Sequence, residues 1–166
     1  KKNKVKRIYL PGAEWVYLKL YCHPAVSNSL LTKCIRSVIS GLKKQNILKS
    51  WYFVRYYDPD HHLRIRIEIN QNDTAEAVKY FDKKIRCHVE KGSINNLLLD
   101  TYKREIERYG EDTIEYVEKV FHFSSELVIN YLRNMAGGMC NYSELHLAIM
   151  SVDAVLGIFF PNNSDR

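Results

Sequence analysis

Two arginines and a glutamate alternate with aliphatic residues in LRIRIEI, residues 63–69. Because successive side chains of a β-strand point to opposite faces, Arg64, Arg66 and Glu68 would share one face of a strand. The two arginines would lie roughly 7 Å apart, and each guanidinium can bind a carboxylate or phosphate through paired hydrogen bonds. The pattern is compatible with an anion-binding site. It is also compatible with a solvated strand face whose arginines pair with Glu68 and nearby acids.

A second polar segment is DTYKREIERYG, residues 100–110. Its strong hydrogen-bonding groups are Arg104, Glu105, Glu107, Arg108 and Tyr109. Glu105 and Arg108 are three residues apart, so they would be neighbours on a helical turn, and Gly110 permits a sharp change of direction after it. An ordinary exposed charge pair, which contributes about 0.3 kcal/mol, explains the same spacing.

The overall charge favours an anionic partner without identifying it. The 166 residues include 25 Lys and Arg against 19 Asp and Glu, a formal net charge of +6. Nucleic acid, phosphate and a carboxylate-rich substrate all fit this balance, as does a basic surface without a partner. With 46% hydrophobic and 27% charged residues, the composition is typical of one globular domain with its own core.

No sequence feature predicts secretion, a membrane span or a metal centre. The cysteines, Cys22, Cys34, Cys87 and Cys140, form no C-x-x-C pair, which favours reduced thiols in a cytoplasmic protein. No apolar run approaches the roughly 20 residues of a membrane span. The histidines show no ligand spacing, and neither a glycine-rich phosphate loop nor a nucleophile elbow is present. We therefore expect neither a metal nor a cofactor.

The spacing of the apolar residues changes several times along the chain. Alternation predicts strands, and spacings of three and four residues predict helices. The turn signal DPD at 58–60 joins two of the strands, which makes residues 51–69 a hairpin. The predicted order is a strand at 15–22, a helix at 24–45, strands at 51–57 and 62–69, a helix from 73 to 92 and a strand at 94–103.

This order predicts an α+β fold with a ferredoxin-like split βαβ antiparallel sheet. Both helices would cover one face of the sheet and leave the other face open. The open face would collect Tyr17, Lys19, Arg55, Arg64 and Arg66. Apolar residues between 114 and 128 and between 145 and 156 predict a helical C-terminal extension, which Gly137 and Gly138 interrupt.

Four segments, in this order, resemble a known family. They are LPGAEWVYLKLYC (10–22), SWYFVRYYDPDHHLRIRI (50–67), DTYKREIERYG (100–110) and VEKVFHFSSELV (117–128). Together they resemble the C-terminal elimination domain of class I lantibiotic dehydratases, a family that includes stand-alone thiopeptide-type bacteriocin biosynthesis proteins. The resemblance extends from around Leu10 to around Phe160, and RYYDPDHHLRIR and REIERYG are its most specific parts.

The resemblance implies a dehydratase component for lantibiotic or thiopeptide biosynthesis. In this family a large domain attaches glutamate from glutamyl-tRNA to serine and threonine side chains of a precursor peptide. The small domain then eliminates the glutamate and leaves dehydroalanine or dehydrobutyrine. The chain would thus be a cytoplasmic, lyase-type enzyme component that acts on the glutamylated core of the peptide.

The same resemblance implies functional residues in both polar segments. Arg64, Arg66 and Arg108 would bind the glutamyl group and the developing oxyanion, because fixed guanidinium donors stabilise such charge. Glu105 would either orient an arginine or take part in proton transfer. The residues expected to complete substrate binding are Arg55, His62, Arg104 and Tyr109.

The chain departs from the family at its C-terminal end. Family members continue into further helices with a histidine and an Asn-Arg motif that contribute to the site, whereas this chain ends at Arg166. We therefore expect a single elimination-type domain over residues 1–166, truncated at its C terminus, with residues 1–9 as a linker-like lead-in. The implied partners are the precursor peptide, a glutamylation domain or subunit, a second copy of the chain, and a cyclase and transporter complex.

Two other functions fit parts of the pattern. One is that of a pyridine-forming cyclase of thiopeptide synthesis or a peptide-binding member of the same superfamily, but we expect the cyclases to lack part of the arginine set that is present here. An RNA-binding sheet is the alternative from another class, because aromatic and arginine side chains on an open sheet face can stack on bases. Glu68 on that face and the missing glycines of the RNA-recognition motif weigh against it.

Overall fold

The chain divides into two compact units, residues 1–130 and 131–166, which are described separately. The computed structural model describes residues 5–139 and 142–159, with side chains up to residue 157. The elements of the first unit are β1 (Ile8–Tyr9), β2 (Trp15–Tyr21), α1 (Pro24–Ser29), α2 (Arg36–Lys44), β3 (Leu48–Tyr57), β4 (His61–Ile69), α3 (Thr74–Glu90), β5 (Asn96–Asp100), β6 (Tyr102–Lys103), α4 (Ile106–Tyr109) and the first part of α5 (Ile114–Ala136).

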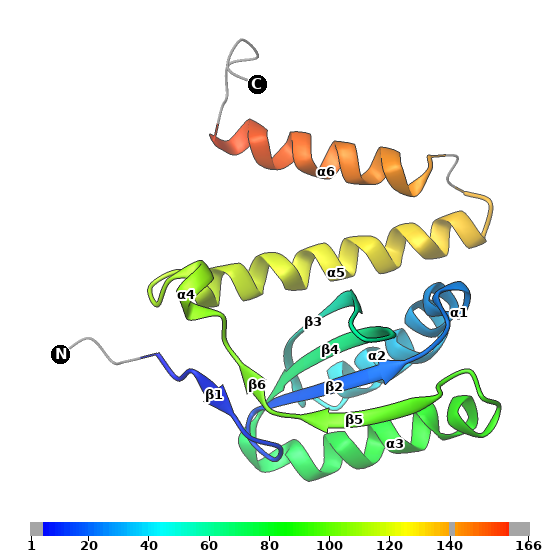
Figure 1. Cartoon of the computed structure of the whole chain (residues 1–166), viewed down its shortest axis with the longest axis vertical. Helices are drawn as coiled ribbons and strands as arrows, with labels where there is room; N and C mark the ends of the chain where they lie inside the picture. The colour runs from blue at the N-terminus through cyan, green and yellow to red at the C-terminus, as the bar shows by residue number, and fades with distance from the viewer. Residues whose placement is uncertain (1–4, 140–141, 160–166) are drawn as a thin grey trace. The chain divides into compact units, whose positions relative to one another are not determined.

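Four antiparallel strands form the main sheet in the order β3-β4-β2-β5 (Figure 1). Counted along the chain, this is second, third, first and fourth, with a helix after the first and the third strand. That arrangement is a ferredoxin-like split βαβ fold. The β3–β4 hairpin pairs Tyr57 with His61 beside the turn and Tyr52 with Arg66 further along. The predicted α+β class and the predicted hairpin are therefore confirmed.

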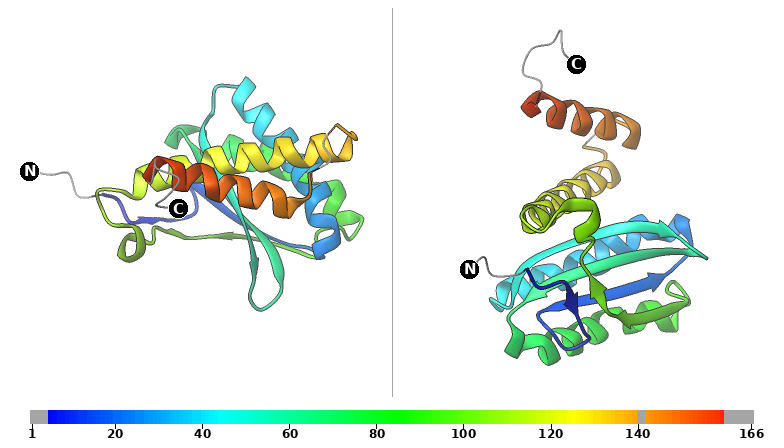
Figure 2. Two further views of the ribbon diagram at one scale, coloured as in Figure 1. Left: turned by 90° about the horizontal axis from the view of Figure 1, so that it is seen from above. Right: turned by 60° about the vertical axis from the view of Figure 1, so that its left-hand side comes forward.

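One face of the sheet packs on α2 and α3, which lie side by side beneath it (Figure 2). The odd-numbered residues of β4, from Leu63 to Ile69, lie on this face and are at most 2% exposed. Burying an aliphatic side chain of this size contributes about 1.5–3 kcal/mol. The first covering helix is continuous from Pro24 to Lys44, because a π-helical segment at Leu30–Ile35 joins α1 to α2. Buried Leu31 and Ile35 lie in that segment.

The opposite face of the sheet is not open, contrary to the expectation from the sequence. Five aromatic side chains, each at most 5% exposed, form a second cluster there: Tyr9, Trp15, Tyr17, Tyr52 and Tyr102. Two of these rings come from a separate two-stranded sheet, in which β1 pairs with β6. The expected lead-in is therefore also corrected, because Ile8 and Tyr9 belong to the fold. Its first four residues lie outside the described part of the chain.

The first part of α5 protects the outer edge of β3. The backbone N–H of Phe53 donates to the hydroxyl of Ser125 at 3.1 Å, and Nδ1 of His122 lies 2.9 Å from the carbonyl oxygen of Trp51. The indole N–H of Trp51 donates to Glu126 at 2.7 Å. A sheet edge leaves backbone groups unpaired unless another element meets them. These side chains therefore fix the helix alongside the hairpin.

The expected fourth strand at 94–103 is two strands. β5 pairs with β2, whereas β6 leaves the main sheet and pairs with β1. The break falls at Thr101, whose backbone N–H donates to the carboxylate of Asp100 at 2.7 Å. Asp100 also forms an ion pair with Lys19 at 2.6 Å. The chain leaves the main sheet there and turns toward α4, as Figure 2 shows.

The second unit consists of the end of α5 and α6 (Glu144–Phe159). Gly138 has a φ of +69° after the end of α5, a conformation that glycine adopts without strain. The predicted helical extension and its interruption are therefore confirmed. Among the described residues, none of the helices combines the length and the apolar character that crossing a membrane requires. Of the cysteines considered above, Cys140 lies outside the described residues.

Candidate functional site

The two polar segments of the sequence meet in one cavity of about 280 Å³. We call it the arginine cavity, because three guanidinium groups contribute to its wall. It lies on the face of the sheet that is opposite α2 and α3. Its lining residues are Tyr52, Val54, Tyr56, Arg64, Arg66, Tyr102, Glu105, Arg108, Tyr109, Ile114 and Phe121.

A second cavity of about 390 Å³ shares part of this wall. Arg64, Arg66 and Glu105 line both cavities, and the second one extends toward the end of β5. Asp100 lines the second cavity as well, and the Lys19 ammonium beside it holds the pKa of that carboxyl below its usual value. Arg64 and Arg66 therefore lie between two cavities, and an extended ligand could occupy both cavities at once.

Arg66 is the most enclosed cation of the site, at 8% exposure. Its guanidinium carbon lies 4.6 Å from the ring centroid of Tyr17, 5.2 Å from that of Tyr52 and 5.0 Å from that of Tyr102. The buried Nε has no hydrogen-bond acceptor among residues 5–139 and 142–157. A buried charge is normally paired, so a guanidinium with donors to offer is suited to bind an anion.

Arg64 is oriented by its neighbour on the same strand face. Its Nε donates to Nε2 of His62 at 3.1 Å, and its guanidinium carbon lies 3.3 Å from the ring centroid of Tyr56. His62, which we expected to contact substrate, is fully buried and does not line the arginine cavity. Its position therefore supports Arg64 rather than a ligand.

Glu105, Arg108 and Tyr109 enter the cavity from α4 and the residue before it. Glu105 precedes the helix, and its carboxylate lies 3.6 Å from Nη1 of Arg108, as the spacing predicted. The Arg108 side chain is 72% exposed, and its guanidinium lies over the ring of Tyr109 at 5.3 Å. Gly110 ends the turn with a φ of +81°. That conformation disfavours other residues and sends the chain into α5.

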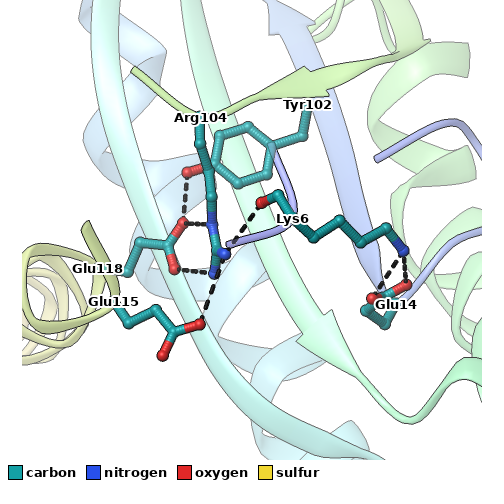
Figure 3. Close-up of polar contacts among 6 residues, drawn as sticks. All are labelled: Lys6, Glu14, Tyr102, Arg104, Glu115 and Glu118. Carbon is teal, nitrogen blue, oxygen red and sulfur yellow. Dashed lines mark hydrogen bonds and ion pairs between the residues drawn. The ribbon is translucent and has the colours of Figure 1, made fainter. Parts of the chain in front are cut away.

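Arg104 does not face the cavity, which corrects its expected role in substrate binding. Its Nε donates to one carboxylate oxygen of Glu118 at 2.8 Å and its Nη2 to the other at 2.6 Å (Figure 3). Burial lowers the pKa of Arg104, but the hydrogen bonds and charge of Glu118 outweigh burial and hold the pKa above its usual value. Both side chains are buried, so this is an internal ion pair.

Arg55 lies on the wrong face of the sheet for the expected role. In the hairpin register Arg55 pairs with Leu63, whereas Val54 pairs with Arg64. The odd-numbered residues of β3 from Trp51 onward thus share the face of α2 and α3. The Arg55 guanidinium donates to the side-chain oxygen of Asn28 in α1 at 2.7 Å. The expectation failed because it grouped Arg55 by strand parity alone, before the register of the hairpin was known.

Sequence reasoning missed the tyrosines and the acid that complete the site. Tyr52 and Tyr102 line the arginine cavity, and their hydroxyls lie 2.8 Å apart. Tyr102 donates to Glu118 at 2.7 Å, so Tyr52 must be the donor to Tyr102. Burial raises the pKa of Tyr52 to about 12 and also raises the pKa of Tyr102, which keeps both hydroxyls protonated. The register would have revealed Tyr52, since it places this residue directly beside Arg66.

Comparison with known proteins gives one family. Residues 15–166 match the family model described as "Lantibiotic biosynthesis dehydratase C-term". The subtilin biosynthesis protein SpaB of Bacillus subtilis is 28% identical over 128 residues, which cover 76% of this chain and 12% of SpaB. The nisin biosynthesis protein NisB of Lactococcus lactis subsp. lactis is 27% identical over 164 residues, which cover 97% of this chain and 16% of NisB. The chain thus spans a small part of these relatives.

Two solved structures share the fold. The tRNA-dependent lantibiotic dehydratase MibB from Microbispora sp. 107891 superposes with a TM-score of 0.68 at 24% identity, over 75% of this chain and 12% of MibB. TsrL superposes with a TM-score of 0.60 at 17% identity, over 82% of this chain and 38% of TsrL. At these identities the likeness establishes the fold alone.

Proposed function

Because this chain belongs to the lantibiotic biosynthesis dehydratase C-terminal family, we propose that its arginine cavity eliminates glutamate from glutamylated serine and threonine residues of a precursor peptide. The products are dehydroalanine or dehydrobutyrine and free glutamate. One observation carries the proposal: Arg64 and Arg66 of β4 line the same cavity as Arg108 of α4, which lies about 40 residues further along the chain. A cavity of about 280 Å³ suits a single side chain with its glutamyl group rather than a folded partner.

The reaction develops negative charge in two places. A base removes the α-proton of the modified residue, and the electron pair of that bond forms the new double bond between Cα and Cβ. The bond between Cβ and the ester oxygen breaks, and glutamate leaves as a carboxylate. Charge accumulates on the carbonyl oxygen beside Cα and on the leaving group, so preorganised donors at both positions accelerate the reaction.

Each arginine has a role that its surroundings support. Arg66 is enclosed among three tyrosine rings, which suits the oxygen where charge develops. Arg64 is held by His62, and it lines both cavities, which suits the leaving carboxylate. Arg108 is exposed at the cavity rim, which suits the free carboxylate of the glutamyl group. Removing one such donor typically slows a reaction about 10²–10³-fold.

Glu105 positions Arg108 in this proposal. Its carboxylate lies 3.6 Å from the Arg108 guanidinium. The glutamylation step belongs to another domain or subunit that uses glutamyl-tRNA. In support, the chain spans 12% of SpaB and 16% of NisB.

A role in RNA binding is less well supported by the same geometry. Stacking on bases needs aromatic rings that solvent can reach. Tyr17 and Tyr52 are the rings beside Arg66 in the sheet, and they are at most 5% exposed. Their faces already pack against the guanidinium.

The test is a synthetic peptide in which one serine carries a glutamyl ester, incubated with the intact enzyme without tRNA. We expect free glutamate and dehydroalanine to appear together. Mass spectrometry distinguishes elimination from ester hydrolysis, because hydrolysis restores serine and gives a peptide that is heavier by one water molecule. The same peptide with unmodified serine is the matched control and should stay unchanged. Release of glutamate with restoration of serine would overturn elimination, and so would no release at all.

A further inference from the structure

Arg66 keeps a buried charge by an unusual arrangement of neighbours. Its surroundings are the rings of Tyr17, Tyr52 and Tyr102, all within 5.2 Å of the guanidinium carbon. Aromatic faces attract a cation through their negative quadrupole. A carboxylate would accept hydrogen bonds from the N–H groups of the guanidinium, whereas a ring face does not take them up in this way. The three rings therefore stabilise the charge and leave donors for a ligand.

The rings differ in how they are held. Tyr17 and Tyr52 flank Arg66 on the two neighbouring strands, so the register of the sheet places them. Tyr102 belongs to β6, which lies outside that sheet. The pairing with β1 holds its backbone, and its ring stacks on Tyr9 at 5.9 Å. Its hydroxyl, at the end of the ring that reaches α5, accepts from Tyr52 at 2.8 Å and donates to Glu118 at 2.7 Å.

Glu118 is in turn fixed by Arg104. Two hydrogen bonds, at 2.8 and 2.6 Å, occupy both carboxylate oxygens, and Arg104 also donates to the carbonyl oxygen of Lys6 at 3.1 Å (Figure 3). Figure 3 shows the Tyr102 ring beside this pair, with its hydroxyl directed at Glu118. The charge of the carboxylate is thus already matched by Arg104. Glu118 can orient Tyr102 without drawing Arg66 into an ion pair.

We propose that Glu118 is a positioning residue of the arginine cavity: held by Arg104, it fixes the Tyr102 ring over Arg66 and so presents the Arg66 guanidinium to an anionic substrate. The positioning itself is a property of the fold. The role toward substrate rests on the proposed function. In that role, the buried Arg104–Glu118 pair determines how well the cavity binds a carboxylate.

The direct test is the ¹H–¹⁵N NMR signal of the Arg66 Nε–H. Protons above aromatic rings are shifted upfield, so this signal should stand apart from those of the exposed arginines, and Arg66→Lys assigns it by its disappearance. In Glu118→Gln the signal should lose much of its upfield shift. Tyr102→Phe, which keeps the ring and loses the hydroxyl, should behave in the same way, and Tyr102→Leu should show the larger loss.

Glu115→Gln is the matched control. Glu115 lies one turn earlier on the same helix, 3.6 Å from Arg104, but it is 66% exposed and has no bond to Tyr102 among the described residues. Its substitution should leave the Arg66 signal in place. Arg104→Lys is a second variant in case Glu118→Gln folds poorly. The lysine keeps a positive charge beside Glu118 but cannot form the two parallel hydrogen bonds of the guanidinium. The Arg66 signal should therefore shift in the same direction as in Glu118→Gln.

Titration with glutarate, a small dicarboxylate, separates this proposal from the proposed function. The wild type should bind it with a further shift of the Arg66 signal, and Glu118→Gln should weaken binding roughly tenfold to hundredfold, the worth of one charge-assisted hydrogen bond. An Arg66 signal that is unmoved in folded Glu118→Gln and Arg104→Lys overturns the positioning role. A signal that moves in Glu118→Gln, while glutarate fails to bind the wild type, supports positioning and overturns the proposed function.

Discussion

Nε of Arg64 donates a hydrogen bond to Nε2 of His62, with 3.1 Å between the two nitrogens, and both residues project from the same face of β4. Nδ1 of His62 lies 2.8 Å from the carbonyl oxygen of Asp60 and donates to it. The imidazole is therefore neutral, with its proton on Nδ1. Its ring is stacked on Tyr21 at 4.6 Å. The histidine that was expected to bind substrate therefore orients an arginine of the cavity instead.

Acid should weaken this arrangement. Burial lowers the pKa of His62 below the usual 6.5, and the nearby positive charges of Arg64 and Lys19 lower it further. A lowered pKa means that the folded state favours the neutral ring. The stability it contributes is full above pH 6.5 and is lost as the pH falls through the lowered value. His62→Gln offers an acceptor that does not titrate.

The measurement is the free energy of unfolding of both proteins across this pH range. The advantage of the wild type over His62→Gln should shrink as the pH falls below 6.5. A difference that stays constant with pH would show that His62 does not titrate in the folded protein as argued.

The buried ion pair should matter more for stability than the exposed one. Arg104→Met leaves Glu118 as an uncompensated buried charge, which typically costs about 3–5 kcal/mol. Arg108→Met removes the partner of Glu105 at the exposed rim, where such pairs contribute about 0–1 kcal/mol. Urea denaturation of both variants gives the comparison. Equal losses would mean that the Arg104–Glu118 pair is solvated rather than buried.

A buried position and an exposed position of the sheet should respond differently to substitution by aspartate. Ile65 is fully buried against the helices, so Ile65→Asp places an unpaired charge in the core, and the loss should exceed about 4 kcal/mol. Leu98→Asp on β5 is the control, because this side chain is 41% exposed. Circular dichroism during thermal unfolding would compare the two variants. Similar losses of stability in Ile65→Asp and Leu98→Asp would contradict the burial of Ile65.

The sequence predicted the sheet and the hairpin because both depend on local signals. Alternation in LRIRIEI and the turn DPD are readable without knowing what lies opposite them. The predicted face of Arg55 was wrong because it depends on a contact that is not local. Which residues of β3 stand beside Arg64 is decided by the register across the turn, and strand parity alone does not fix that register.

The role of Arg104 could not be predicted for a similar reason. In the sequence it belongs to the same polar segment as Glu105 and Arg108, but its partner Glu118 lies on the next helix. The aromatic cluster that covers the sheet also depends on a long-range pairing, of β1 with β6. Such contacts between distant segments decide which polar residues face a cavity and which are enclosed.

The central claim is tested most directly by Arg66→Lys in the intact enzyme, with Arg55→Lys as the control on the opposite face. Lysine keeps the charge but lacks the planar, bidentate donor of arginine, so elimination should slow about 10²–10³-fold. Mass spectrometry should then show precursor peptide that retains its glutamyl groups. Arg55→Lys should give fully dehydrated peptide at the rate of the wild type. If Arg66→Lys also dehydrates the peptide at that rate, the arginine cavity is not the site of elimination.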